Sequence, residues 1–350
     1  MKRILIIVIF FYSISFIYSD DERYYFVDNG MIGYFNSDRQ IVIPARYTYA
    51  TPFNDGHAIV NLSRYNFAVI NPNGDIIFRF FSENEYPRIS DGMIIFTHNR
   101  IDGFYNLKGE IVLDGYERAS NFTEGSAVIM RGKKSYYIDK SGDPYFKDKD
   151  IQPDFDYARP FKNGLALIRN IRNGKDYYGF INKSGDYVIS DKYVYLGDYF
   201  TDGLCVAAIE YDYQRTKKGV IDINEEWIIP PKYYDIRIIS KELFIVRYQD
   251  DTYPRGYWKL IDNKENDIKI FNPGSVATNT IINGNMILLS AKNSDAYFLV
   301  DFKGEFIFNG WFERIYMTQK GNYTSIVIKG KDAIITPEGK IVFNKDFFKD

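Results

Sequence analysis

A short apolar phrase ending in Asn or Asp recurs along the chain, and each copy is followed by a turn and a second apolar run. The aromatic and β-branched residues of these phrases predict β-strands, and helical periodicity is absent after the first 19 residues. The copies occupy 34–36, 69–71, 104–106, 137–139, 180–182, 220–222, 260–262 and 299–301, with a degraded copy at 334–336. Their last residues are 35, 35, 33, 43, 40, 40, 39 and 35 positions apart. Such a period indicates a ring or stack of small units, none of which buries its own apolar face alone.

One unit illustrates how the phrase is expected to fold. Residues 178–182 predict a strand, 182–185 predict a type I turn with Asn first and Gly fourth, and 187–189 predict the returning strand of a hairpin. The turn recurs at 71–74, 106–109, 139–142, 301–304 and 336–339. Three units depart from it, because Arg39, Glu225 and Glu265 stand where the glycine is expected.

A second phrase joins successive hairpins, at 49–56, 117–125 and 157–164. Its Phe is expected to be a buried anchor, its Gly to end a turn, and the apolar run after it to form a third strand. A short extended piece before the Phe is a candidate fourth strand. The sequence therefore predicts an all-β chain, with residues 20–350 forming a single array of about nine units of about 37 residues.

These units resemble the WG-type repeat family, also called KWG, whose consensus joins a Trp-Gly strand, a turn ending in Gly, an apolar strand and a Phe-x-x-Gly-x-Ala phrase. The best copies are 178–189, 161–166 and, for the proline exit of the strand, 228–233. The Trp survives only at Trp258, where Lys259 replaces the Gly, while Tyr178 and Lys218 precede the glycine of two other units. The resemblance covers nearly all of the chain after residue 19. It implies extracytoplasmic or effector-type interaction scaffolds and no activity common to all members.

Two closures of the array fit this pattern. Three or four antiparallel strands in about 37 residues correspond to a propeller blade, in which radial packing leaves only short edges. An open β-superhelix would use the same units but would have to protect its two ends. We expect a propeller-like fold, with the open superhelix as the alternative.

The first residues have the pattern of a secretory signal. Lys2 and Arg3 precede an apolar stretch over 4–18, and Ser19 stands before an acidic run. The stretch is shorter than the ~20 residues that span a bilayer. We expect residues 1–19 to be a signal peptide cleaved after Ser19, so that the protein is secreted or periplasmic with no membrane span. An uncleaved N-terminal membrane anchor is the alternative.

The composition narrows the chemistry. A net charge of −2 argues against nucleic acid as a partner, and the single cysteine, Cys205, excludes an intramolecular disulfide. Sister units carry alanine at that position, which predicts a buried packing role for Cys205. No HExxH, CxxC, GxSxG or GxGxxG phrase occurs, so no catalytic residue, metal site or cofactor is predicted. A hydrolase would need two carboxylates converging across a cleft outside the repeat turns.

Three consecutive units have a longer connection before their hairpin, at 170–177, 210–217 and 247–256. Equivalent insertions in neighbouring units are expected to lie side by side on one face, where insertions often form a binding surface. Tyr and Arg dominate contact energy at interfaces. The candidate partner-binding residues are Arg172, Lys175, Tyr177, Tyr211, Tyr213, Arg215, Tyr248, Tyr253 and Arg255. The competing interpretation is that these are loops without a binding role. The chain holds 31 Tyr in all, so Tyr residues in loops need no functional explanation.

The sequence therefore favours a non-catalytic repeat scaffold for protein–protein interaction. The partner would be a protein or a surface polymer, since stacked Tyr rings and Asn amides also suit a carbohydrate or cell-wall binding module. A secreted propeller-type hydrolase is a remote alternative.

Overall fold

The computed structural model describes residues 22–147, 153–209, 216–248, 257–271, 275–282, 286–291, 297–307, 314–315, 323–328, 330–336 and 340–348. The expected signal peptide, residues 1–19, lies outside these ranges.

Within the described ranges the strands form nine antiparallel sheets, each made only of strands that follow one another along the chain. We number these sheets as units. Unit 1 holds β1 (Tyr24–Asp28), β2 (Met31–Phe35) and β3 (Ile41–Tyr47); unit 2 holds β4 (Ala58–Ser63), β5 (Asn66–Ile70) and β6 (Ile76–Phe81); unit 3 holds β7 (Ile89–Ser90), β8 (Met93–His98), β9 (Ile101–Asn106) and β10 (Ile111–Tyr116). Unit 4 holds β11 (Arg118–Ala119), β12 (Ser126–Arg131) and β13 (Lys134–Asp139); unit 5 holds β14 (Tyr157–Ala158), β15 (Leu165–Arg172), β16 (Lys175–Asn182) and β17 (Tyr187–Tyr193); unit 6 holds β18 (Tyr195–Leu196), β19 (Leu204–Ala208), β20 (Lys218–Asp222) and β21 (Trp227–Tyr233). Unit 7 holds β22 (Asp235–Ser240), β23 (Leu243–Tyr248), β24 (Tyr257–Asp262) and β25 (Asp267–Ile270); unit 8 holds β26 (Ser275–Ile282), β27 (Met286–Ala291) and β28 (Tyr297–Asp301); unit 9 holds β29 (Arg314–Ile315), β30 (Thr324–Ile328), β31 (Lys331–Ile335) and β32 (Ile341–Phe343), followed by α1 (Asn344–Phe347).

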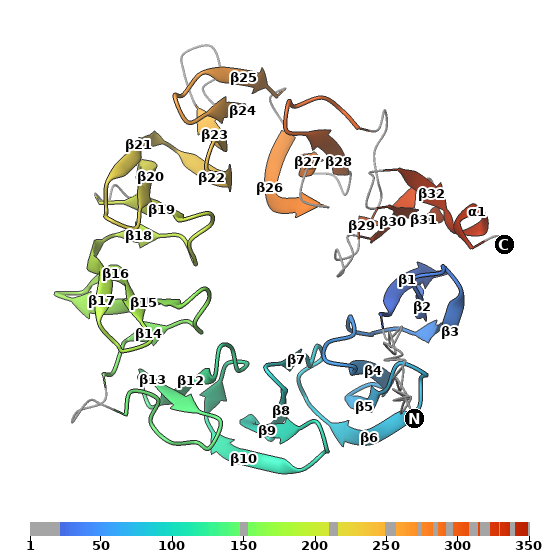
Figure 1. Cartoon of the computed structure of the whole chain (residues 1–350). Helices are drawn as coiled ribbons and strands as arrows, with labels where there is room; N and C mark the ends of the chain where they lie inside the picture. The colour runs from blue at the N-terminus through green and yellow to red at the C-terminus, as the bar shows by residue number, and fades with distance from the viewer. Residues whose placement is uncertain are drawn as a thin grey trace, which may run out of the picture.

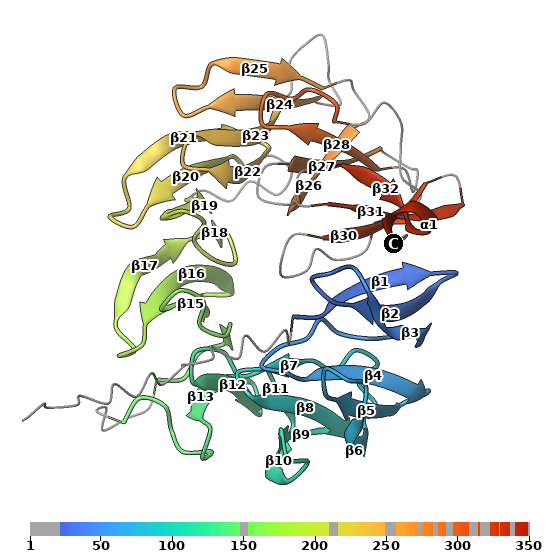
Figure 2. The same ribbon diagram turned by 45° about the vertical axis from the view of Figure 1, so that its right-hand side comes forward.

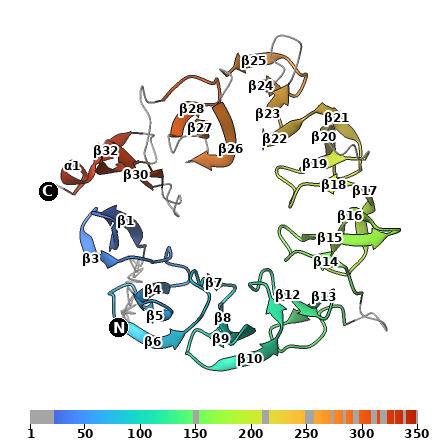
Figure 3. The same ribbon diagram turned by 180° about the vertical axis from the view of Figure 1, so that it is seen from behind.

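The units stand around a common axis in chain order (Figure 1), and the same ring is seen from behind in Figure 3. In unit 7 the first strand, β22, lies towards the middle of the ring and the last, β25, on the outer rim. Clusters of buried apolar side chains fill the spaces between neighbouring units, as between units 5 and 6 and between units 6 and 7. The expected propeller-like, all-β fold is confirmed. No helix in the described part of the chain is long and apolar enough to span a bilayer.

The ring closes where unit 9 and α1 lie beside unit 1 (Figure 2). We call this contact the closure seam. Phe35 is 1% exposed, and its ring centroid lies 5.4 Å from that of Phe347. The backbone N–H of Asn29 donates to Asp332 Oδ2 at 2.8 Å, and Asn344 Nδ2 donates to the carbonyl oxygen of Val27 at 2.7 Å. These contacts join the two ends directly, which excludes the open superhelix.

The expected hairpin turn is present at Asn182. Its Oδ1 accepts hydrogen bonds from the backbone N–H groups of Ser184 at 2.9 Å and Asp186 at 3.0 Å, and Gly185 N donates to the Asn182 carbonyl at 2.9 Å. Gly185 has a φ of 77°, a left-handed conformation that glycine adopts without penalty.

The three departures from this turn keep its backbone. Arg39, Glu225 and Glu265 have φ values of 64°, 64° and 65°, a conformation that costs about 1–2 kcal/mol for a residue with a Cβ. Each of these side chains reaches the preceding unit around the ring. Arg39 places its Cζ 5.0 Å from the ring centroid of Phe347, so in unit 1 the preceding unit is unit 9. The residue that breaks the sequence pattern therefore belongs to a junction.

Glu225 and Glu265 accept hydrogen bonds from the unit before them. The carboxylate of Glu225 accepts from the Tyr193 hydroxyl at 2.9 Å and from the Ser190 backbone N–H at 2.9 Å. In the next junction the Tyr233 hydroxyl donates to Glu265 Oε2 at 2.7 Å. Each carboxylate also pairs with the lysine before that tyrosine, Lys192 or Lys232. We call these two arrangements the Glu clamps.

The Gly of the Trp-Gly phrase has a separate role. Four units have Gly there, at Gly33, Gly103, Gly179 and Gly219, and in each the pairing with the outer strand is bulged at that position. A Cβ on Gly219 would lie 2.3 Å from the carbonyl oxygen of Ile229. Where Ala68 or Lys259 replaces the Gly, the pairing runs through without that bulge. Close backbone approach thus explains the glycine, whether or not a Trp precedes it.

The first of the three expected insertions differs from expectation. Residues 170–177 are not a loop between units, because β15 and β16 run through them and pair as far as Arg172 and Lys175. Only Asn173 and Gly174 remain as the turn, with φ values of 53° and 72°, as a two-residue hairpin requires. The strand after the Phe phrase and the hairpin after it therefore belong to one sheet. The insertion lengthens a hairpin within unit 5.

Candidate binding pocket

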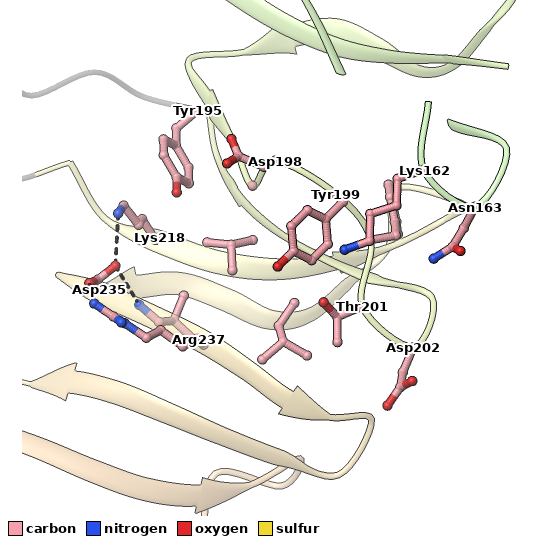
Figure 4. Close-up of a pocket in the computed structure, with 15 residues that line it drawn as sticks. Lys162, Asn163, Tyr195, Asp198, Tyr199, Thr201, Asp202, Lys218, Asp235 and Arg237 are labelled. Atoms are coloured by element: carbon pink, nitrogen blue, oxygen red, sulfur yellow. Dashed lines mark hydrogen bonds and ion pairs between the residues drawn. The ribbon is translucent and has the colours of Figure 1, made fainter. Parts of the chain in front are cut away.

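A cavity of about 610 Å³ lies between units 6 and 7, and β22, which lines it, lies towards the middle of the ring (Figure 1). One wall is β22, through residues 235–238, and the other is the segment 197–202 that leads from β18 to β19. Lys162 and Asn163 from unit 5 border one end (Figure 4). The pocket is therefore made by three successive units, and no single repeat contains it.

The Phe phrase positions the side chains at the end of the pocket that Lys162 and Asn163 border. In unit 6 the backbone N–H of Thr201 donates to the carbonyl of Leu204 at 2.8 Å, which closes a turn over Asp202 and Gly203. Both turn residues are left-handed, with φ values of 51° and 79°. Phe200 is 8% exposed and anchors the turn in the core, as the sequence predicts. Unit 5 repeats this arrangement and presents its own turn to the same cavity.

At the other end, which we call the Lys218 end, two cations share one carboxylate. Lys218 Nζ lies 3.0 Å from Asp235 Oδ1, and an Arg237 nitrogen lies 3.6 Å from Asp235 Oδ2. Lys218 Nζ also sits 4.3 Å from the ring centroid of Tyr195, and Arg237 Cζ sits 5.1 Å from that of Trp258. The aromatic faces hold the cations in place. Because two cations share one carboxylate, positive charge is in excess at this end. This end suits a ligand that carries a carboxylate.

Tyr195 remains a hydrogen-bond donor in this setting. Burial raises the pKa of its hydroxyl, and the charges of Asp235 and Asp198 raise it further. Asp198 itself is paired, since an Arg159 nitrogen lies 2.9 Å from its Oδ1.

The end formed by units 5 and 6, which we call the Lys162 end, is more exposed. Lys162 Nζ lies 3.4 Å from the ring centroid of Tyr199, whose side chain is 44% exposed. The hydroxyl of Thr201 and the carboxylate of Asp202 border the same end (Figure 4). This end offers an aromatic surface and several hydrogen-bonding groups.

The chemistry available here is binding through charge, hydrogen bonds and aromatic contact. Two of the pocket's carboxylates, Asp198 and Asp235, are engaged in ion pairs. Cys205 lies behind the wall with no exposed surface, and burial raises the pKa of its thiol to about 12, so the thiol stays protonated. Its expected packing role is confirmed. In the described residues, no group of three or more His, Cys, Asp or Glu side chains is placed to hold a metal ion.

The predicted site residues that the structure describes lie outside the pocket. Arg172 and Lys175 end the β15–β16 hairpin, and Arg172 Cζ lies 4.5 Å from the ring centroid of Tyr177. Arg172 also donates to the backbone carbonyl of Asp191 in β17, which turns its guanidinium towards its own sheet. Lys175 is exposed at the tip. The structure thus brings Arg172 and Tyr177 together within one unit.

Tyr248 ends β23 two units further on, with a ring centroid 6.0 Å from that of Tyr257 and 6.4 Å from that of Tyr233. Its ring therefore packs within and beside its own sheet. The remaining candidates lie outside the described residues: Tyr211, Tyr213, Arg215, Tyr253 and Arg255. Their role in binding stays a prediction.

Sequence reasoning missed the pocket. Its residues occupy different repeat positions in units 5, 6 and 7, so no single phrase marks them. The sequence does contain one signal: Tyr195, Asp198 and Tyr199 stand immediately before Phe200, the buried anchor of a Phe phrase.

Comparison with protein families decides the nature of the repeats. The model for the WG-containing repeat matches residues 32–63, 103–134, 151–175, 178–213 and 219–253. The chain carries WG-containing repeats at these five positions. The matched copies lie in units 1 to 7, and units 5, 6 and 7 form the pocket. No curated protein matches the sequence.

Solved structures resemble this WG-repeat chain in fold alone. The crystal structure of a eukaryotic initiation factor is similar with 11% identity and a TM-score of 0.62, over 92% of this chain and 95% of that one. BamB from Moraxella catarrhalis is similar with 10% identity and a TM-score of 0.47, over 85% of this chain and 98% of that one. At such identities the likeness extends to the arrangement of strands and not to function.

Proposed function

We propose that this WG-repeat protein is a non-catalytic scaffold that works outside the cytoplasm and binds a partner protein in the pocket between units 5, 6 and 7. The observation that supports this is the wall itself: exposed Tyr199 and Tyr195 and the cations Lys218 and Arg237 line one cavity. Tyr and Arg in a concave site are the residue types that dominate binding energy at protein interfaces. The location rests on the signal-like residues 1–19.

A carbohydrate or cell-wall polymer is the second candidate ligand, because Tyr199 lies beside Thr201, Asp202 and Asn163. A sugar ring would stack on the face of Tyr199. The ammonium of Lys162 already lies 3.4 Å from that ring's centroid, so one face is occupied by a cation. This contact leaves only the other face of Tyr199 for a sugar, so we place the carbohydrate second.

The test is capture by the immobilised full chain from separated envelope proteins, cell-wall polymer and surface glycan. We expect saturable capture of one protein, and the double variant Tyr199→Ala/Arg237→Ala should weaken it more than about tenfold, because hot-spot side chains contribute about 2 kcal/mol or more each. Circular dichroism checks that the variant remains folded. The matched control is the triple variant Tyr211→Ala/Tyr213→Ala/Tyr253→Ala, which removes three of the partner-binding residues predicted from the sequence and should leave affinity unchanged if the pocket is the site.

Loss of capture in the triple variant alone would place the binding surface at the insertions predicted from the sequence and contradict the pocket. Capture by polymer alone would favour the carbohydrate module. Release of products from a polymer by the purified chain would contradict the absence of catalysis.

A further inference from the structure

The first strand of unit 7 is longer than the first strands of five other units. The first strands of units 3, 4, 5, 6 and 9 have two residues each, whereas β22 has six. In its sheet β22 is hydrogen-bonded to β23 alone. Its other side is therefore a sheet edge, and alternate backbone N–H and C=O groups point away from the sheet along it. The first strand of unit 8, β26, is longer still, with eight residues.

The pocket follows this edge. Residues 235–238 of β22 form one wall, and the segment 197–202 of unit 6 forms the other. Figure 4 shows the Lys218 end and the Lys162 end at opposite ends of the same cavity. Six residues of strand span about 20 Å, so a partner of similar length in extended conformation would run from one end to the other.

Apolar and charged side chains alternate along the β22 wall. Ile236 is 3% exposed and Ile238 is partly buried, while Asp235 and Arg237 carry charge between them. Val206 and Phe200 add apolar surface opposite. An added strand places every second side chain on the same face, so one set would meet the apolar wall and the other the charged groups.

The charges favour an acidic ligand. Lys218 and Arg237 share Asp235, and at the far end Lys162 rests on Tyr199. Two further carboxylates border the cavity. Asp198 is paired with Arg159, whereas the negative charge of Asp202 would repel an acidic ligand group near the Lys162 end. Positive charge is therefore in excess at the Lys218 end, where an acidic side chain would be drawn in.

We propose that the partner contributes an extended acidic segment, which adds as a further strand to the free edge of β22 and places a carboxylate between Lys218 and Arg237. This inference rests on the proposed function and specifies its ligand. The backbone edge provides affinity that does not depend on sequence. The Lys218 end and the apolar wall provide selection among partners.

The probe is a fluorescent, terminally blocked peptide of about eight residues with alternating Glu and Val, long enough to pair with all of β22. The comparison probes are the Lys and Val counterpart and an acidic peptide N-methylated at alternate amides. With the full chain we expect saturable binding of the acidic probe by fluorescence anisotropy, at least about tenfold tighter than the basic one. N-methylation in one of the two alternate registers should abolish binding, because it removes the donors that face β22, while the other register should have little effect.

Lys218→Glu should weaken the acidic probe by at least about tenfold. The matched control, Lys175→Glu, makes the same charge change at the exposed hairpin tip and should leave binding within twofold. The N-methylated probes need no protein variant, so the inference stays testable even if Lys218→Glu perturbs the fold.

Equal binding of acidic and basic probes, indifference to both N-methylated registers, or no binding at about millimolar peptide would overturn strand addition at β22. Each of these results leaves the proposed function intact if partner capture is still lost in Tyr199→Ala/Arg237→Ala. Unchanged capture in that variant would instead contradict the proposed function itself.

Discussion

The closure seam and the Glu clamps solve the same problem with different chemistry. Every junction in the ring packs one sheet against the next, but the junctions after units 5 and 6 add a carboxylate that accepts hydrogen bonds from a tyrosine of the preceding unit. At the seam the equivalent turn position is Arg39, which lies over Phe347, and the remaining contacts are mainly aromatic.

The difference lies in what each junction must achieve. Units 5, 6 and 7 are joined by the chain, so their clamps mainly fix orientation, and the pocket between them depends on that orientation. Units 9 and 1 are joined only by non-covalent contacts, which must offset the loss of freedom when the two ends meet. Aromatic burial provides more free energy for that task than an exposed ion pair.

The largest expected effect is at the seam. Phe35→Ala should cost about 3–5 kcal/mol of unfolding free energy, because it removes a fully buried ring and leaves a cavity. Phe244→Ala in unit 7 is the matched control, since Phe244 is equally buried but lies away from the seam. Chemical denaturation should show similar losses for both. Only Phe35→Ala should enlarge the native particle in small-angle scattering, and a ring of unchanged size would contradict the role of the seam.

A smaller effect is expected at a clamp. Glu225→Ala should cost about 2 kcal/mol, because it removes charge-assisted hydrogen bonds from Tyr193 and Ser190. Glu225→Gly removes the same bonds but relieves the left-handed backbone at φ 64°, so it should be about 1 kcal/mol more stable than the Ala variant. Urea denaturation measures both. Equal stability of the two variants would show that the backbone at this turn stores no strain.

The smallest effect is the opposite pH response of the two regions. Burial alone would raise the pKa of Glu225, but Lys192, the Ser190 N–H and the Tyr193 hydroxyl outweigh it and lower that pKa. The clamp therefore stabilises the fold above the usual Glu pKa, and this contribution is lost as the pH falls through the lowered value.

At the seam, burial raises the pKa of Asp332, with Asp28 adding to it and the Asn29 N–H opposing. Protonation of Asp332 thus stabilises the seam at low pH, and this contribution is lost as the pH rises through the raised value. Asp332→Asn should gain a few tenths of a kcal/mol at neutral pH after solvent screening, whereas Glu225→Gln should lose stability there. Stability measured between about pH 3 and 7 checks both. A loss in Asp332→Asn at neutral pH would reverse the sign assigned to the seam.

Much of the fold could be predicted because it is local. The turn at Asn182 needs only its own side chain and Gly185, and the buried Phe200 follows from the phrase around it. The sequence shows Glu225 and Glu265 only as departures from the expected glycine. Their partners, Tyr193 and Tyr233, stand 32 residues earlier, and only the stacking of units brings them together.

The candidate site was harder for the same reason. Tyr199, Lys218 and Arg237 belong to different repeat positions, so their convergence depends on how far each unit turns from the last. The hairpin of unit 5 illustrates the converse: the sequence shows the extra residues, but the structure places them within the β15–β16 hairpin, where Arg172 donates to the backbone carbonyl of Asp191 in its own sheet.

The seam also dictates an order of assembly. Asn29 and Asp332, which meet there, are 303 residues apart in the chain, so we expect the seam to form after most of the other units. Contacts of such separation form late, because the entropy of closing the loop is lost before they are made. Until then the aromatic face of unit 1 is exposed to solvent, and such hydrophobic surface is prone to aggregation. A chaperone that shields this face until α1 arrives would raise the yield of closed rings without altering their final stability.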